Sequence, residues 1–356
     1  MNLDSVGRNL AAFKPVRAAL MGLAAGAMAF LIACGGGGGD DGTEGPSGPD
    51  GGSLSGSLTI DGSSTVFPIS EAVAEEFLTE QKNVRVTVGL SGTGGGFQKF
   101  CNGETEISDA SRPITQKEID ACAAKGIEFI ELPVAYDALS VVVNSQNNWV
   151  DCITVAELKK MWEPAAQGTV TSWAQVNPAW SAGGQLKLFG PGTDSGTFDY
   201  FTEHVMGKAK DSRGDYTASE DDNVLVQGVS GDKSAIGYFG LAYYLENKGK
   251  LKALKVDQGQ GGGCVEPSAA TVENGTYPLS RPLFIYVRKD AAERPEVKAF
   301  VDFYLKNVAT LSTEVGYVKF PDNYYGLVQA RWNARKTGTM YATGSTGTLL
   351  ERLQRS

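Results

Sequence analysis

One stretch of sequence decides the fold: Leu58-Thr59-Ile60-Asp61-Gly62-Ser63-Ser64-Thr65-Val66-Phe67-Pro68. Its first three residues predict a short strand. Apolar residues at three- to four-residue spacing after Pro68 predict a helix over residues 69–81. The loop between them is rich in glycine and hydroxyl residues, and loops of the same kind between a strand and a helix occur at residues 91–97 and 190–198. This alternation of strands and helices predicts an α/β fold with mainly parallel sheets.

The rest of the chain continues the alternation. Strands are predicted at residues 84–88, 127–132, 139–143, 186–189, 236–239 and 283–287, and helices at residues 97–101, 115–125, 154–161, 197–205 and 297–308. The polar residues 207–222 are predicted to form a surface loop, and residues 336–356 a loosely docked tail.

Composition excludes several classes of protein. The chain has 356 residues, enough for about two domains, and its 42% of hydrophobic residues excludes wholesale disorder. A net charge of -9 excludes a general nucleic-acid binder, which needs a basic surface against the phosphates. The single histidine excludes any metal site that needs two.

The first 57 residues indicate export and tethering. Residues 1–33 predict a signal peptide, because three basic residues precede an uncharged apolar run that is too short for a membrane span of about 20 residues. The run ends just before Cys34 and resembles a bacterial lipobox, so Cys34 is the predicted lipidation site; an ordinary signal peptide with an incidental cysteine is the alternative. Residues 34–57 are glycine-rich and acidic and predict a flexible linker.

Export permits disulfides, and the four remaining cysteines are an even set. Of the three possible connectivities we favour Cys101–Cys122 and Cys152–Cys264, because each pair then lies within one predicted domain. The alternative is that some of these cysteines are free buried thiols.

The three glycine- and hydroxyl-rich loops predict an anion site. A helix N-terminus carries unpaired N–H groups and a partial positive charge, glycine permits close backbone approach, and hydroxyl groups add donors. Any one loop alone could be an N-capped turn. Three of them after strands of an α/β body indicate a ligand site.

Asp109 and Arg112 form a fourth element. Arg112 can offer a planar fork of donors to an oxyanion. Asp109 repels an anion unless that anion carries a proton, which an ionised carboxylate then accepts. Hydrogen phosphate carries such a proton at neutral pH and sulfate does not. The alternative is that Asp109 and Arg112 pair with each other.

These motifs, in this order, resemble the PstS family, the phosphate-binding subunits of bacterial phosphate ABC transporters, over about residues 58–335. The resemblance places the phosphate-binding residues at Ser64, Thr65, Val66, Ser91, Thr93, Asp109, Ser195, Gly196 and Thr197. Some members carry an arginine shortly before the Ser-Gly-Thr loop, whereas here residues 190–193 are Gly-Pro-Gly-Thr. Arg112 is the predicted replacement.

The resemblance also implies the architecture. It is the two-lobed, type II periplasmic-binding-protein fold: two α/β lobes joined by two hinge strands that close on the ligand. We expect residues 58–139 with 288–335 in one lobe, residues 144–282 in the other, and crossings at 139–143 and 283–287.

The sequence thus predicts a membrane-anchored lipoprotein on the periplasmic or cell-surface side that captures inorganic phosphate for an ABC transporter permease. We expect a monomer, not an enzyme, with no metal, cofactor or nucleic-acid partner. The alternatives are a binding protein for another oxyanion, a phosphate sensor, and a phosphatase. The last is the weakest, because Ser195 lacks the G-x-S-x-G context and the lone His204 is predicted on the back of a helix as a surface or packing residue.

Overall fold

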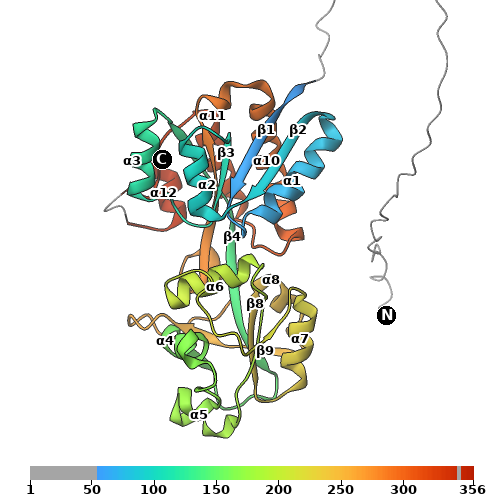
Figure 1. The fold of residues 1–356 in the computed structure, drawn as a ribbon, viewed down its shortest axis with the longest axis vertical. Coiled ribbons are helices and arrows are strands. Elements are labelled where there is room, and N and C mark those ends of the chain that lie inside the picture. Colours follow the sequence, from blue (N-terminus) through green and yellow to red (C-terminus); the bar gives the residue numbers. More distant parts are fainter. Residues whose placement is uncertain (1–53, 343–345) are drawn as a thin grey trace, which may run out of the picture. The chain divides into compact units, whose positions relative to one another are not determined.

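The computed structural model describes residues 54–342 and 346–356, which belong to one compact α/β unit with two lobes (Figure 1). The predicted signal peptide, Cys34 and most of the predicted linker lie outside the described residues. The linker was predicted to extend to residue 57, but strand β1, Ser55–Gly62, already begins at Ser55. It does so because Ser55 pairs in register with Asn83 of β2.

In the first lobe, β1 is flanked by two parallel neighbours, β2 and β3. Helices lie on both sides of these strands (Figure 1). The elements of this lobe, besides β1, are β2 Asn83–Leu90, β3 Ile107–Ala110, α1 Phe67–Glu80, α2 Gly92–Cys101, α3 Gln116–Ala124, η3 Ala291–Glu293, α10 Pro295–Glu314, α11 Asp322–Asn333 and α12 Leu349–Arg355.

In the second lobe, β6 is parallel to both β7 and β8, and a separate parallel pair joins β5 and β10. The elements of this lobe and of the chain that leads out of it are β5 Cys152–Thr154, α4 Val155–Trp162, η1 Pro164–Ala166, α5 Trp173–Val176, η2 Pro178–Gly183, β6 Lys187–Gly190, α6 Gly196–Met206, β7 Thr217–Ala218, α7 Asp222–Gly231, β8 Ala235–Gly240, α8 Leu241–Glu246, β9 Leu251–Ala253, β10 Lys255–Asp257 and α9 Ala269–Glu273.

Two long strands connect the lobes, β4, Phe129–Asn144, and β11, Ser280–Arg288. The prediction of two separate strands at 127–132 and 139–143 is wrong, because β4 runs continuously through both. Its first part pairs with β11 and its last part with β8 and β9, all antiparallel. Residues 284–287 pair with β3 in the first lobe, so the predicted crossing at 283–287 is displaced and β11 crosses at its start, near Ser280. The sheet is therefore mixed rather than mainly parallel.

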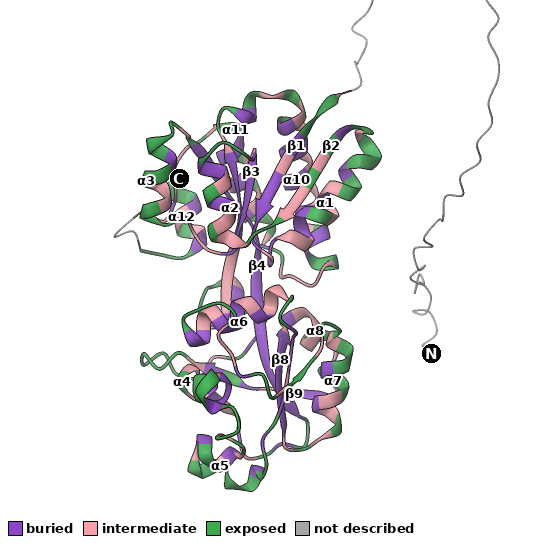
Figure 2. Cartoon of the chain, viewed as in Figure 1, coloured by how far each residue is buried: buried purple, intermediate pink, exposed green. Residues whose placement is uncertain are grey.

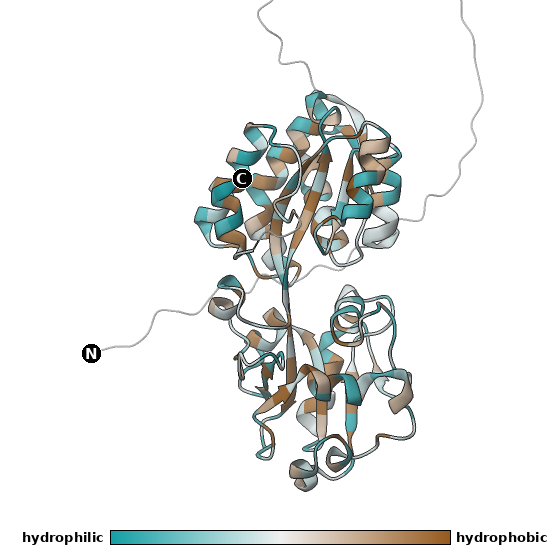
Figure 3. Cartoon of the chain, turned by 90° about the vertical axis from the view of Figure 1, so that its left-hand side faces the viewer, coloured by the Kyte–Doolittle hydropathy of each residue, from teal (hydrophilic) through white to brown (hydrophobic). Residues whose placement is uncertain are grey.

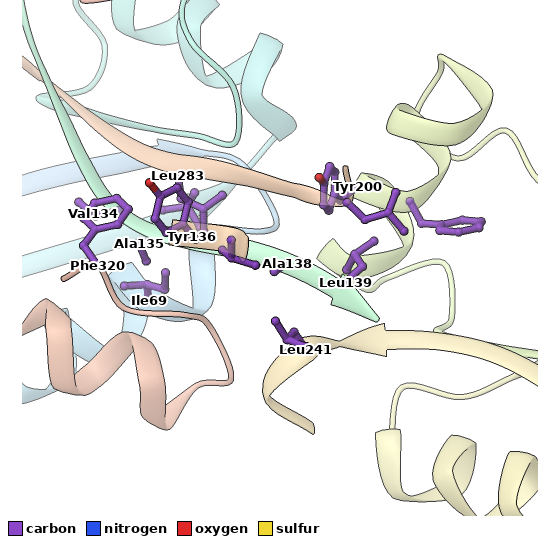
Figure 4. Close-up of a cluster of buried hydrophobic side chains, with 14 of the residues drawn as sticks. Ile69, Val134, Ala135, Tyr136, Ala138, Leu139, Tyr200, Leu241, Leu283 and Phe320 are labelled. Atoms are coloured by element: carbon purple, nitrogen blue, oxygen red, sulfur yellow. The ribbon is translucent and has the colours of Figure 1, made fainter. Parts of the chain in front are cut away.

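Burial explains why β4 can serve both lobes. Every residue of β4 is buried, and Figure 2 shows the strand as buried along its length. In each lobe the largely apolar strands form the interior, and the helices that cover them have polar outer faces (Figure 3). Apolar side chains follow β4 from one lobe to the other, from Val134 and Tyr136 to Leu139, with Leu283 of β11 and Tyr200 of α6 beside them (Figure 4). A single apolar cluster thus spans the crossing.

The predicted disulfides are confirmed. Cys101 bonds to Cys122 between α2 and α3, with a Cα–Cα distance of 4.3 Å. Cys152 bonds to Cys264 in the second lobe, with a Cα–Cα distance of 5.9 Å. Each bond lies within one lobe, which is the reason that favoured this pairing.

Two segments differ from the predicted loose loops. Residues 207–222 contain β7 and the buried Arg213, which donates to Asp215 and to main-chain oxygens of Met161 and Val170. The tail is firmly docked, because α12 buries Leu349 and Leu353. Within the described residues no helix combines the length and apolar character that crossing a membrane requires.

Candidate anion-binding site

Two of the predicted loops, one from each lobe, meet face to face. The Thr65 hydroxyl donates to the Gly196 carbonyl at 3.3 Å, and the Ser64 hydroxyl donates to Asp199 Oδ2 at 2.8 Å. A Cβ atom placed on Gly196 would lie 2.7 Å from the Thr65 Cα, so glycine is required for this approach. The structure therefore brings Ser64, Thr65 and Val66 against the Ser195–Thr197 loop.

The helices that begin at these loops differ in how their N-termini are satisfied. Neither α1, preceded by Val66, nor α2, preceded by Ser91, has a side-chain cap. Helix α6 is capped by the Ser195 side chain, which accepts from the Thr197 N–H at 3.1 Å. In α1 the N–H groups of Phe67, Ile69 and Ser70 donate to main-chain oxygens of Ser63 and Val66, so it is the first turn of α2 that offers N–H groups without a capping side chain to an anion.

Asp109 lies beside the first loop, at the end of β3. Its carbonyl accepts from the Ser63 N–H at 3.0 Å, and its Oδ1 accepts from the Ser70 hydroxyl of α1 at 2.9 Å. Asp109 is 0% exposed, so water does not reach its Oδ2. That oxygen has no hydrogen-bond partner within the described residues. Burial raises the pKa of Asp109 to about 7, against the lowering effect of the Ser70 hydrogen bond.

The predicted loop at residues 91–97 and helix at 97–101 are wrong in their bounds, because α2 already begins at Gly92; its first turns pack closely on the first loop. A Cβ on Gly96 would lie 2.5 Å from the Gly62 Cα. Thr93 Oγ1 is 3.1 Å from Ser111 Oγ and accepts from the Ser111 N–H at 3.2 Å. The Ser91 hydroxyl donates to Asp61. Thr93 thus faces the β3 end, whereas the Ser91 hydroxyl is engaged within its own lobe.

Arg112 is held by the first turn of α3. Its Nη1 and Nη2 donate to the two carboxylate oxygens of Glu118 at 2.9 and 2.8 Å, which raises the pKa of Arg112. Glu118 also accepts from Thr115 in a capping box. The alternative in which Asp109 pairs with Arg112 is thereby excluded. The Thr-x-x-Glu spacing at 115–118 was the signal for this carboxylate.

Sequence reasoning missed Arg281, at the start of β11. Its side chain is 13% exposed and contacts Thr65 of the first loop, at 3.2 Å from Nη2 to Oγ1. The available signal was an arginine directly before the apolar run of a predicted crossing strand.

A cavity of about 320 Å³ opens beside these groups. It is lined by Ser111, Arg112, Pro113, Tyr200, Glu203, His204, Arg281 and Pro282. His204 therefore lines the space between the lobes instead of facing away from it, and burial lowers its pKa. Its position does not create a nucleophile pair, because Ser195 Oγ accepts from the Thr197 N–H rather than contacting this ring.

Comparisons of the sequence and of the fold with known proteins find phosphate-binding proteins among the relatives of this chain. Residues 47–308 match the PBP superfamily domain. The chain is 56% identical over 286 residues to the protein SphX of Synechococcus elongatus, covering 80% of this chain and 84% of that protein. It is 40% identical over 311 residues to the phosphate-binding protein PstS of Staphylococcus saprophyticus, covering 86% and 91%. Its fold is similar to the crystal structure of a possible phosphate binding protein from Planctomyces limnophilus, with 51% identity, a TM-score of 0.77, and coverage of 80% and 100%.

Proposed function

Since the chain belongs to the PstS family within the PBP superfamily, we propose that it binds inorganic phosphate between its two lobes and delivers it to the permease of an ABC transporter. Bound phosphate is the hydrogen phosphate ion, held by residues 64–66, Thr93, Asp109 and residues 195–197. The donors are helix N-terminal N–H groups and hydroxyls, so the site needs no basic surface on an acidic protein.

The observation that carries this proposal is the buried Asp109. A carboxylate oxygen without a partner is costly in a protein interior. It can also accept a hydrogen bond from a ligand, and the O–H group of hydrogen phosphate can donate one. Sulfate at neutral pH has no proton to give and would face a repelling carboxylate. Asp109 therefore selects hydrogen phosphate over sulfate.

Closure of the lobes completes the site. Ser64 and Thr65 come from one lobe and Asp199 and Gly196 from the other, so their hydrogen bonds exist only when the lobes are together. The proposed lobes are residues 58–139 with 288–335, to which the fold adds the start of β1 and helix α12, and residues 144–282. β4 and β11 link them and are where opening and closing take place.

A thermal-shift panel on purified protein, freed of bound phosphate by unfolding and refolding, tests the function. A ligand present at 100 times its Kd and bound only to the folded state adds about 2.7 kcal/mol of stability. Phosphate and its close analogue arsenate should raise the Tm, and sulfate and molybdate should leave it unchanged. Equal shifts with sulfate and phosphate, or none with phosphate, would refute the proposal.

Two further parts of the proposal concern context. The protein is a lipoprotein anchored through Cys34 after removal of residues 1–33, and it acts outside the cytoplasm as a monomer. Labelling with a radioactive fatty acid should mark the wild type and not Cys34→Ser. The protein is also not an enzyme, so incubation with a chromogenic phosphate ester should release no product; steady turnover would overturn this part alone.

A further inference from the structure

Arg281 lies where both lobes and the crossing strands meet. Its Nη2 donates to Thr65 Oγ1 at 3.2 Å in the first lobe, and its Nη1 donates to Glu203 Oε2 at 3.1 Å on α6 of the second lobe. Its Nε donates to Asp137 Oδ2 of β4 at 3.4 Å. One guanidinium group therefore joins a loop of the candidate site, the opposite lobe and the hinge.

The plane of this guanidinium is fixed. It lies over the Tyr200 ring with 3.8 Å between its central carbon and the ring centroid, and Figure 4 shows Tyr200 beside the start of β11. An arginine has five N–H donors, of which three have partners here within the described part of the chain. The remaining two are available to a further acceptor at a site that is nearly closed to solvent.

Two other cations near the loops, Arg112 and Lys99, are engaged within the first lobe. Arg112 gives both terminal nitrogens to Glu118. Lys99 Nζ lies 2.7 Å from Asp61 Oδ2. Of these three cations, Arg281 is the one that donates to a hydroxyl of a predicted phosphate loop, Thr65, although Asp137 and Glu203 also pair with it.

We propose that Arg281 is the cationic group of the anion site and couples anion binding to closure of the lobes. This inference rests on the proposed function. By donating to Thr65 Oγ1, Arg281 leaves the Thr65 proton for another acceptor, either the Gly196 carbonyl or the bound anion. Its position in the hinge strand lets it act on both lobes at once.

The neighbouring acids limit the size of the effect. Asp137 and Glu203 offset most of the charge of Arg281, so the anion is held mainly by N–H and hydroxyl donors. A hydrogen bond to a charged group contributes about 1.5 to 3 kcal/mol. Loss of Arg281 should therefore weaken phosphate binding about 10- to 100-fold rather than abolish it.

The test is titration calorimetry with inorganic phosphate on the wild type, Arg281→Gln, Arg281→Lys and, as the competing arginine of the same cavity, Arg112→Gln. We expect Arg281→Gln to bind about 10- to 100-fold more weakly, Arg281→Lys to recover part of the loss because it keeps the charge without the planar fork, and Arg112→Gln to lose less affinity than either Arg281 variant. Recovery by lysine distinguishes a role of the charge from a merely structural one.

Two results would overturn the inference: an Arg281→Gln affinity within about 3-fold of the wild type, or a larger loss in Arg112→Gln than in Arg281→Gln. If circular dichroism shows that Arg281→Gln does not fold, Arg281→Lys decides, since it must bind more weakly than Arg112→Gln. Failure of the wild type to bind phosphate would instead refute the proposed function. The experiment therefore distinguishes failure of the proposed function from failure of the role given to Arg281.

Discussion

Two fully buried carboxylates in the first lobe contrast in how they are satisfied. Glu131 of β4 accepts from the Tyr286 hydroxyl, the Thr339 hydroxyl and the Met340 N–H, each at 2.7 Å. The Asp109 side chain accepts from Ser70 at Oδ1, and its Oδ2 has no hydrogen-bond partner within the described residues. Both side chains are 0% exposed, and burial raises the pKa of both.

The difference in partners indicates that Glu131 stabilises the fold and that Asp109 belongs to a ligand site. Glu131 ties the tail, through Thr339 and Met340, to the centre of the first lobe, and the protein supplies all of its partners. Asp109 lies among loops that expose donors, and the protein supplies only part of its hydrogen bonding. A buried polar group that the fold leaves incomplete indicates where a ligand completes it.

The largest effect should come from Asp109→Asn. The amide cannot accept the phosphate proton with the strength of a carboxylate and does not repel sulfate. Sites built around a ligand hydrogen reject the analogue without it by large factors, so the ratio of phosphate to sulfate affinity should fall on the order of 10³-fold. Titration calorimetry with both anions measures it. An unchanged ratio would remove the special role given to Asp109.

A smaller effect, on stability alone, should come from Glu131→Ala. It leaves three donors without an acceptor in the interior, which costs roughly 3 kcal/mol or more of unfolding free energy. Chemical denaturation measures that loss, and Glu131→Gln, which keeps one acceptor for the Met340 N–H, is the milder control. Phosphate affinity of the folded variant should be unchanged. If Glu131→Ala instead lost phosphate affinity as much as Asp109→Asn does, the claim that Glu131 acts on stability alone would be wrong.

The smallest effect concerns pH and the phosphate-free protein. The Asp109 pKa is about 7 in the folded protein and 3.8 is its ordinary value. Between these values the folded state keeps a proton that the unfolded state has released, so this group's contribution to stability is complete below about pH 4 and is lost as pH rises to about 7. Asp109→Asn lacks this loss and should be more stable than the wild type at pH 8.

Denaturation curves of both proteins at pH 4.5 and pH 8 measure this difference. The gap between the variant and the wild type should widen with pH, because only the wild type ionises a buried Asp109. A gap that is constant or narrows would mean that Asp109 is ionised without cost in the free protein. Asp137, whose pKa burial raises to about 6, is present in both proteins and cancels in the comparison.

Local sequence predicted the parts of the site that are local. Residues 63–66 precede α1 and residues 195–197 form the N-cap and first residues of α6, as their glycine and hydroxyl content indicates, and the disulfides followed from the domain limits. The tail helix also had a local signal, the Thr348-x-x-Glu351 capping box, that was not used.

The remaining features depend on contacts between distant segments. Arg281 and Thr65 are far apart in sequence and meet because β11 pairs with β3, which in turn pairs with β1, the strand that leads into the Thr65 loop. β4 looked like two strands because Pro133 interrupts its apolar pattern, yet Pro133 is accommodated opposite Phe284, where the β4–β11 register shifts. Arg112 is predicted as the replacement for the arginine that some family members carry, whereas in the structure its carboxylate partner is Glu118 in the first turn of α3.

The most direct test of the central claim is the distance between Asp109 Oδ2 and the nearest phosphate oxygen in a high-resolution structure of the phosphate complex. An O–H···O⁻ hydrogen bond to an ionised carboxylate is about 2.5 to 2.7 Å long. We predict a distance in that range, with Oδ1 still bonded to Ser70. A phosphate bound elsewhere, or an Oδ2 separated from the anion by a water molecule, would contradict the claim.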